Sequence, residues 1–215
     1  MRGQISATAE AQPDVSYLPG MLRRRLDTPG RMALATAWPC ADGLETVQLV
    51  FASRHGALTR TMEMLTAMAN EEPLSPTLFS LAVHNSNAGL FSIARGDRGA
   101  ATAMAAGEDS LPLAILEAAN MVMEGAPHVL VTCTDERAPA PYQSGIGDPP
   151  GLPFAVSLLL TPAADDAPRC RIGRRPQAQP DAPPQTALMR FLIGDADRVL
   201  LGVRQCWQLE RAHAG

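Results

Sequence analysis

The sequence predicts an α/β fold in which helices flank a mostly parallel β-sheet. Short, almost uninterrupted apolar runs, typical of buried strands, alternate with segments of helical periodicity between residues 47 and 133. The 215 residues are 46% hydrophobic but only 4% aromatic, and alanine is abundant. A chain of this length and apolar content can bury a core, and its many small side chains favour close packing of helices on a sheet.

Glycine, proline and charged residues bound the expected strands. The first strand is flanked by Gly43 and Gly56, and the third ends at Asp135-Glu136. Beyond it, a Pro- and Gly-rich stretch over 139–153 separates the first three strands from the last two. The expected strands cover residues 47–53, 100–104, 128–133, 154–160 and 199–203, the last together with Trp207.

Capping residues indicate where helices begin. Asp27 is an expected N-cap with Pro29 in the first turn, Ser75-Pro76 is a strong start signal, and Ser110 is expected to cap a later helix. Apolar residues at helical spacing follow each of these positions. Helices are expected over 18–26, 27–38, 59–70, 75–81, 110–122 and 186–192, with one more running from a break at 84–87 to Ile93.

A single folded domain is expected over residues 16–207. Residues 1–15 are interpreted as a disordered leader, 162–184 as a mobile loop rich in Pro, Asp and Gln, and 208–215 as a tail. The first residues lack the apolar segment of a signal peptide, and nowhere do about 18 apolar residues run uninterrupted, as a membrane span requires. A cytoplasmic protein without a membrane span is therefore expected.

The charge balance argues against a nucleic-acid partner. The formal net charge is −4 and the sequence pI is about 5.5, whereas domains that bind nucleic acid present basic surfaces. The basic runs at 23–25 and 174–175 are short, so a solvated face or an acidic protein partner explains them. The four cysteines contain no C-x-x-C pair, so neither a zinc site nor a disulfide framework is expected, nor any other metal or cofactor. They are Cys40, Cys133, Cys170 and Cys206.

Ser75 and His84 are the candidate catalytic side chains. Ser75 offers a hydroxyl nucleophile, but its place before a proline favours a helix cap. His84, followed by Asn85, lies at a helix junction, where it either orients a substrate or is a structural histidine bonded to nearby backbone. The structural role is the favoured interpretation.

Side chains at the strand ends offer further chemistry. His55 follows the first strand, at the edge where open α/β sheets bind ligands, although a role in a turn or an interface is favoured. Asp135 and Glu136 could serve as an acid–base pair, but solvated carboxylates at a strand exit are the commoner arrangement. Cys133, flanked by threonines, is expected to be an inert core thiol.

Three segments carry a resemblance to a known family: Arg23-Arg24-Arg25-Leu26, FASRHG at 51–56 and LSPTLFSLAVHN at 74–85. With these motifs in this order, the chain resembles the beta-ketoacyl-synthase-like N-terminal family, whose members in bacterial gene clusters are described as chain length factors. The resemblance covers roughly residues 18–207 and implies a thiolase-like (half-thiolase) layered fold. Members often lie in clusters resembling those for aryl polyene pigments.

The resemblance places a nucleophile turn at residues 102–107. Ketosynthases carry a cysteine in a Thr-Ala-Cys-x-x-Gly pattern, and Met104 stands where that cysteine would be. A thioether cannot be deprotonated and cannot form a thioester. Ketosynthases also use two histidines from their C-terminal half, whereas only His213 follows Cys133 here. No catalytic residue is therefore expected.

The resemblance implies a non-catalytic, chain-length-factor-like subunit. Such a subunit forms a heterodimer with an active beta-ketoacyl synthase in fatty-acid or polyketide-type biosynthesis and meets an acyl carrier protein transiently. The methionines Met62, Met64, Met68, Met121 and Met123 are either core filler or the border of an acyl tunnel. Two alternatives stay open: a degenerate acyltransferase or thioesterase that uses Ser or His residues, and a folding relic or regulatory binder.

Overall fold

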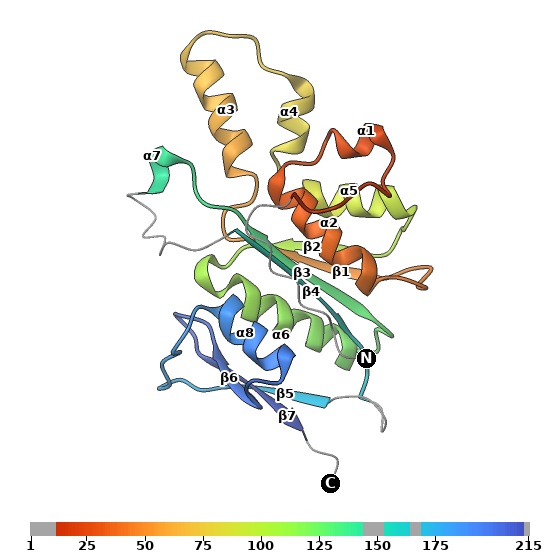
Figure 1. The fold of residues 1–215 in the computed structure, drawn as a ribbon, viewed down its shortest axis with the longest axis vertical. Coiled ribbons are helices and arrows are strands. Elements are labelled where there is room, and N and C mark those ends of the chain that lie inside the picture. The colour runs from red at the N-terminus through yellow and green to blue at the C-terminus, as the bar shows by residue number, and fades with distance from the viewer. Residues whose placement is uncertain (1–11, 144–152, 164–168, 213–215) are drawn as a thin grey trace.

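A four-stranded sheet with the strand order β2-β1-β3-β4 forms the centre of the molecule (Figure 1). The structure is a computed structural model and describes residues 12–143, 153–163 and 169–212. Strands β1, β2 and β3 are parallel and β4 is antiparallel to β3, so the expectation of a mostly parallel central sheet is confirmed. The strands are β1 Gln48–Ala52, β2 Ala101–Met104, β3 Val129–Asp135 and β4 Phe154–Leu160.

Burial explains why the two central strands are apolar at successive positions. Residues 49–52 of β1 and 129–134 of β3 are all buried. A strand that is covered on both faces carries apolar side chains continuously, whereas a half-exposed strand alternates. Strand β2 consists of alanine, threonine and methionine instead, and its first two residues are exposed at the edge of the sheet.

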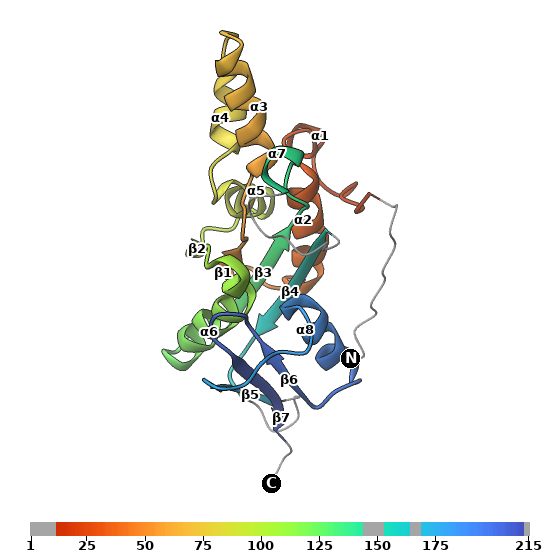
Figure 2. The ribbon, with the colours of Figure 1, turned by 90° about the vertical axis from the view of Figure 1, so that its left-hand side faces the viewer.

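Helices cover both faces of the central sheet (Figures 1 and 2). Alternate residues of β1 divide between two cores, since Leu49 and Phe51 pack with α2 and α5, whereas Val50 and Ala52 pack with α6 and α8. This layering is the α/β arrangement that the sequence predicts. The helices are α2 Thr28–Cys40, α5 Ser86–Arg95, α6 Ser110–Met123 and α8 Pro184–Ile193.

A second, antiparallel sheet packs against α6 and α8, and the sequence analysis did not predict it. Its strands are β5 Arg169–Arg174, β7 Trp207–Ala212 and β6 Arg198–Leu201, in that spatial order. The loop expected over 162–184 therefore contains a strand, with residues 164–168 outside the described part. Because Ile172 is the only large apolar residue of β5, pairing with β7, rather than a local pattern, makes this segment a strand.

The expected end of the domain is also wrong. Residues 208–212 of the expected tail belong to β7, and the single strand expected over 199–203 with Trp207 is a hairpin of β6 and β7. Gly202 allows the turn because its φ of +103° lies in the region that disfavours other residues. A Cβ atom at this position would also lie 2.1 Å from the carbonyl oxygen of Gln205.

Ordered contacts begin before residue 16, the expected start of the domain. Val15 is only 2% exposed and belongs to the same core cluster as Leu18. The backbone amide of Ser16 donates to Asp14 Oδ1 at 2.8 Å, and α1 Gly20–Arg23 follows. The interpretation of 1–15 as a disordered leader is therefore wrong for Val15, and residues 1–11 lie outside the described part.

Two of the three expected helix caps are confirmed. Asp27 Oδ1 accepts a hydrogen bond from the Gly30 amide at 2.8 Å, and the Ser75 hydroxyl accepts one from the Leu78 amide at 3.2 Å. Ser110 is not a cap but the first residue of α6, preceded by Asp109 at the N-cap. Its hydroxyl accepts from the Ala106 amide at 3.0 Å and donates to the Gly107 carbonyl at 2.7 Å, which fastens the turn before the helix.

Helices α3 Leu58–Ala69 and α4 Pro76–Leu81 project from the body as a hairpin (Figure 1). Its base is held by Arg60, a buried residue of α3 that forms an ion pair with Asp27 at 3.2 Å. The Arg60 guanidinium also donates to the backbone carbonyls of Leu81 at 2.9 Å and Arg25 at 2.5 Å. One side chain thus ties α3 to the end of α4 and to the segment before α2.

Candidate functional site

Met104 is the last residue of β2, at the edge of the central sheet. The chain then turns through Ala105 and Ala106 into a short 3-10 turn, Gly107–Asp109, which leads directly into α6. Gly107 has a φ of +62°, a conformation that glycine adopts without strain. Met104 therefore lies at a sharp strand-to-helix turn, and its half-buried side chain packs against the core beneath α6.

His84 lies beside this turn. Its Nε2 atom is 2.9 Å from the Met104 carbonyl oxygen, which it reaches as a donor, and the Ser53 amide donates to the same oxygen at 3.3 Å. The ring also lies edge-on to Phe51, with the centroids 6.3 Å apart. On the other side of the ring, a Cβ atom at Gly56 would lie 2.8 Å from Nδ1. The structure thus brings together three segments that the sequence analysis singled out: 51–56, His84 and Met104.

Asp135, at the end of β3, binds the loop that follows β1. Its carboxylate accepts from the Ser53 hydroxyl at 2.7 Å and from the backbone amides of Arg54 at 2.8 Å and His55 at 3.2 Å. The Ser53 hydroxyl in turn accepts from the Gly56 amide at 2.8 Å. Burial raises the pKa of Asp135, and these donors oppose that rise. Asp135 therefore positions the loop that carries Arg54 and His55.

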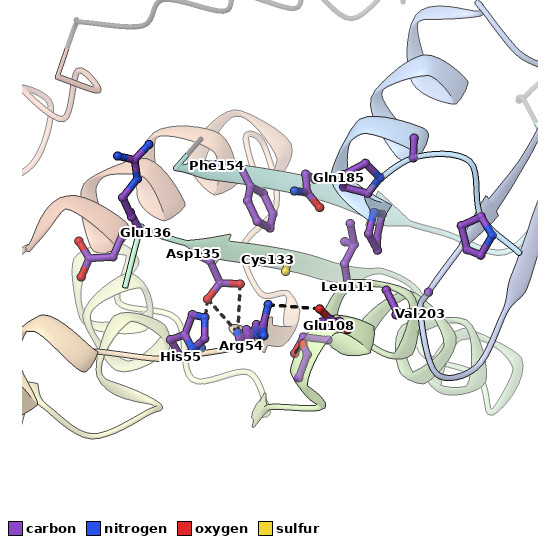
Figure 3. Close-up of a pocket in the computed structure, with 18 of the residues that line it drawn as sticks. Arg54, His55, Glu108, Leu111, Cys133, Asp135, Glu136, Phe154, Gln185 and Val203 are labelled. Atoms are coloured by element: carbon purple, nitrogen blue, oxygen red, sulfur yellow. Dashed lines mark hydrogen bonds and ion pairs between the residues drawn. The ribbon is translucent and has the colours of Figure 1, made fainter. Parts of the chain in front are cut away.

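Glu136 points away from Asp135 and toward α3. It accepts a hydrogen bond from the Thr59 hydroxyl at 2.5 Å, and burial raises its pKa. The two carboxylates therefore bond to different elements and do not form a pair that shares a proton. In Figure 3 they extend from β3 in different directions.

A cleft of about 810 Å³ lies at the carboxyl ends of β1 and β3 (Figure 3). This edge is where ligands bind in open α/β sheets. Arg54 spans part of the cleft and pairs with Glu108 at 3.6 Å, whereas Leu111 and Phe154 give one wall an apolar character. The segment 179–185, which runs into the first turn of α8, and the turn at Gly202 and Val203 close the far side.

Asp109 holds that far side in place, and the sequence analysis did not single it out. It is buried, and its carboxylate accepts from the backbone amides of Val203 at 2.5 Å, Arg204 at 3.2 Å and Gln205 at 3.1 Å. Asp109 and Asp135 therefore act alike, each binding the amides of one loop beside the cleft. The only local signal for Asp109 is its position just before an expected helix start, which predicts a cap rather than a contact with a distant loop.

The sequence matches the family described as "Beta-ketoacyl synthase, N-terminal domain" over residues 2–207. The chain belongs to this family. The likeness predicted from the motifs at 23–26, 51–56 and 74–85 is thus confirmed, and the thiolase-like fold of ketosynthases is the fold of this chain.

Solved structures of ketosynthases have the same fold as this ketosynthase-family chain. One is the structure of the ketosynthase ApeO in complex with its chain length factor ApeC from Xenorhabdus doucetiae. It matches with a TM-score of 0.77 and 28% identity, over 90% of this chain and 82% of the matched chain. The ishigamide ketosynthase/chain length factor matches with a TM-score of 0.61 and 19% identity, over 86% of this chain and 60% of that one.

A third similar structure is a beta-ketoacyl synthase from Burkholderia phymatum. Its TM-score is 0.53 at 14% identity, and the match covers 63% of this chain and 36% of the other. At such identities, this likeness and that to the ishigamide protein show the fold alone. No curated protein was found to match the chain.

The remaining candidate residues of this ketosynthase-family chain lie apart from the turn at Met104. Ser75 caps α4 on the projecting hairpin and does not line the cleft. Cys133 does line the cleft, but burial raises the pKa of its thiol well above the ordinary value, which keeps the thiol protonated. His213 lies outside the described residues.

The methionines divide into packed and exposed ones. Met121 packs against the core, whereas Met68 on α3 and Met123 on α6 are mostly exposed. The interpretation as core filler is therefore wrong for Met68 and Met123. None of the five methionines lines the cleft that the described residues form.

Nowhere in the described part of the chain do three His, Cys, Asp or Glu side chains stand close enough to hold a metal ion. No helix in it has both the length and the apolar character needed to cross a bilayer.

Proposed function

We propose that this chain is a non-catalytic, chain-length-factor-like subunit that pairs with an active beta-ketoacyl synthase in fatty-acid or polyketide-type biosynthesis, with an aryl-polyene-like pathway as the specific setting. The observation that carries the proposal is Met104 at the strand-to-helix turn between β2 and α6. This position matches the family's nucleophilic cysteine, and a thioether offers neither a thiolate nor a bond to an acyl group. The likeness to a structure that contains a ketosynthase with its chain length factor supports the pairing.

The edge of β2 supports a protein interface beside Met104. No strand in the described part of the chain pairs with the outer side of β2, and an open edge is a template for pairing with another chain. Large apolar side chains are exposed on α5, which lies beside β2, on α4 and at the junction between the two helices (Figure 2). Phe79 on α4 and Ile93 on α5 are each 64% exposed, and Val83 at the junction is 45% exposed. Exposed apolar side chains of this size are typical of interaction sites.

The projecting hairpin extends the same surface. Leu65 and Met68 on α3, together with Leu74 before α4, are exposed although they are apolar. Arg60 fixes the base of the hairpin, so these side chains are presented in a defined position. A partner that covers them would explain why the chain keeps an apolar hairpin outside its own core. An acyl carrier protein then visits the pair transiently, because the nucleophile that accepts its acyl group belongs to the partner.

Co-expression with a candidate partner, an active beta-ketoacyl synthase from the same source organism, tests the proposal. We expect a 1:1 complex by size-exclusion chromatography with light scattering, and condensation of malonyl groups by the pair but not by this chain alone. The double variant Phe79→Glu/Ile93→Glu should abolish the complex, whereas Met123→Glu, which alters an 85%-exposed apolar residue on α6, should leave it intact. Condensation or thioester hydrolysis by the isolated chain would contradict the proposal and support the acyltransferase or thioesterase alternative.

A further inference from the structure

The second sheet has one covered face and one open face. Side chains alternate between the two faces of a strand, and Val199, Leu201 and Leu209 are buried toward α6 and α8. The residues between them must therefore point away from the body, toward the side opposite these helices (Figure 1). By register, the outward positions are Arg171 and Gly173 on β5, Gln208 and Glu210 on β7, and Arg198 and Leu200 on β6.

A connected row of polar side chains crosses this open face. Arg198 Nη2 donates to Glu210 Oε1 at 2.9 Å, and Gln208 Nε2 donates to Glu210 Oε2 at 2.9 Å. Arg175 Nε completes the row by donating to Gln208 Oε1 at 2.9 Å. Each of the two arginines uses one N–H group in this row, and a guanidinium has five. The row thus holds two guanidinium groups in fixed positions while most of their donors stay available.

A further arginine stands beside this row. Arg171 lies directly across from Glu210 in the register of β5 and β7, and its charge acts on that carboxylate. Arg171 is exposed, and within the described residues it has no carboxylate within ion-pair distance. Glu210 is therefore shared between arginines on both of its neighbouring strands, and the described side chains of this face are more basic than acidic.

The charge of the whole chain is distributed unevenly, with the positive net charge in the C-terminal part that contains the second sheet. Residues 169–215 contain eight arginines and four acidic residues, a formal charge of +4, whereas residues 1–168 have a formal charge of −8. The chain contains no lysine, so every basic group is a planar guanidinium, which binds carboxylates in a bidentate manner. The C-terminal sheet is thus a basic surface on an acidic protein.

We propose that the open face of the second sheet, defined by Arg171, Arg175 and Arg198, is a docking surface for a protein that presents clustered carboxylates. Charge alone on β5 and β6 would also be explained as protection of the two edge strands against pairing. That explanation does not account for the hydrogen bonds that hold Arg198 and Arg175 in one row through Glu210 and Gln208 across the face. Preorganised guanidinium groups lower the entropy cost of binding an anionic group.

Nucleic acid fits this surface less well than an acidic protein does. The outward positions include no aromatic side chain for stacking on bases. The charge of −8 on the rest of the chain repels a long polyanion. A compact partner contacts only the sheet, and screening at physiological salt limits the repulsion that it feels from the rest of the chain to about 8 Å. This proposal does not depend on the proposed function, since it concerns a surface on the opposite side of α6 from β2.

Fluorescence anisotropy with a labelled oligo-glutamate peptide, added to the full chain, tests the surface. We expect saturable binding that weakens by at least about tenfold in Arg171→Glu/Arg175→Glu and falls as salt is raised. Neither residue has an ion pair to lose among the described residues, so the variant should keep its fold, checked by circular dichroism. If the double variant does not fold, Arg171→Glu alone, on the edge strand β5, should show a smaller loss in the same direction.

The matched control is Arg24→Glu/Arg25→Glu, which makes the same change in net charge on exposed residues between α1 and α2. This control should bind the peptide nearly as well as the wild type. Equal affinities of wild type and Arg171→Glu/Arg175→Glu would overturn the proposal. So would stronger binding of oligothymidylate or of phosphatidylglycerol vesicles than of the peptide. Self-association that only this variant loses would overturn it too, by showing a second copy as the occupant.

Discussion

His84 Nε2 lies 2.9 Å from the carbonyl oxygen of Met104, so a histidine that is a candidate catalytic residue is bonded to the backbone of the turn between β2 and α6. The bond joins the α4–α5 junction to the end of β2. It also brings the ring against Phe51 and close to Gly56. His84 thus supports the turn and the neighbouring open edge of β2, which we propose as the partner interface.

Replacing His84 with alanine should loosen this turn. The change removes one hydrogen bond and one aromatic contact, and we expect the free energy of unfolding to fall by about 1–2 kcal/mol. Affinity for the ketosynthase partner should fall as well. Chemical denaturation and a pull-down measure the two effects. His84→Gln, which keeps a donor, should lose less of both; equal stability of His84→Ala and wild type would show that the bond is not needed.

A cysteine at the turn should not make this chain catalytic. Met104→Cys places a thiol at the position that, on the proposed function, matches the nucleophile, but residues 134–215 contain one histidine, His213, where a ketosynthase uses two to activate a thioester. We expect the variant to fold, to bind the partner and to show no condensation of malonyl groups. A radiometric condensation assay measures this. Turnover by isolated Met104→Cys would mean that other residues of this chain supply the missing groups.

Asp135 should make stability depend on pH in a specific direction. Burial raises its pKa above the ordinary value of 3.8, so the folded state holds the proton more tightly than the unfolded state does. The contribution of this group to stability is therefore fully present below pH 3.8 and is lost as the pH rises through the raised pKa. The control is Asp135→Asn, which keeps Glu136 and every other titrating group.

The difference in unfolding free energy between wild type and Asp135→Asn should consequently grow as the pH falls from 7 toward 4. At pH 7 we expect Asp135→Asn to be less stable by about 1–3 kcal/mol, because one carboxylate binds the loop through the Ser53, Arg54 and His55 donors. Urea denaturation at several pH values measures both quantities. A difference that shrinks on acidification would show that the pKa of Asp135 is lowered rather than raised.

Removing the Arg60 side chain should release the α3–α4 hairpin from the body. Arg60→Ala leaves Asp27 without its ion pair and two backbone carbonyls without a donor, a change of the kind that costs about 3–5 kcal/mol. We expect faster proteolysis and faster hydrogen exchange within residues 58–81. Arg98→Ala, on an exposed residue, is the matched control and should behave as the wild type. Unchanged exchange in the hairpin would show that packing, not Arg60, holds it.

Local patterns were enough to predict the central sheet and most of the helices around it. Strands β1 and β3 are almost continuous apolar runs because both of their faces are covered, whereas β4 is half-buried along its whole length. The caps at Asp27 and Ser75 need only a backbone amide three residues away. Met104 is also read from the sequence, and its match to the nucleophile position is what the family resemblance implies.

Only the tertiary structure decided the rest, because the partners are far apart in the chain. Strand β5 has one large apolar residue and exists through its pairing with β7. Asp135 and Asp109 each bind a loop that is more than 80 residues away, and no local sequence pattern near either residue predicts that contact. His84 reaches Met104 only once α5 and β2 lie side by side. The methionine at position 104 is thus a property of the sequence, whereas the hydrogen bond and the packing around it are properties of the fold.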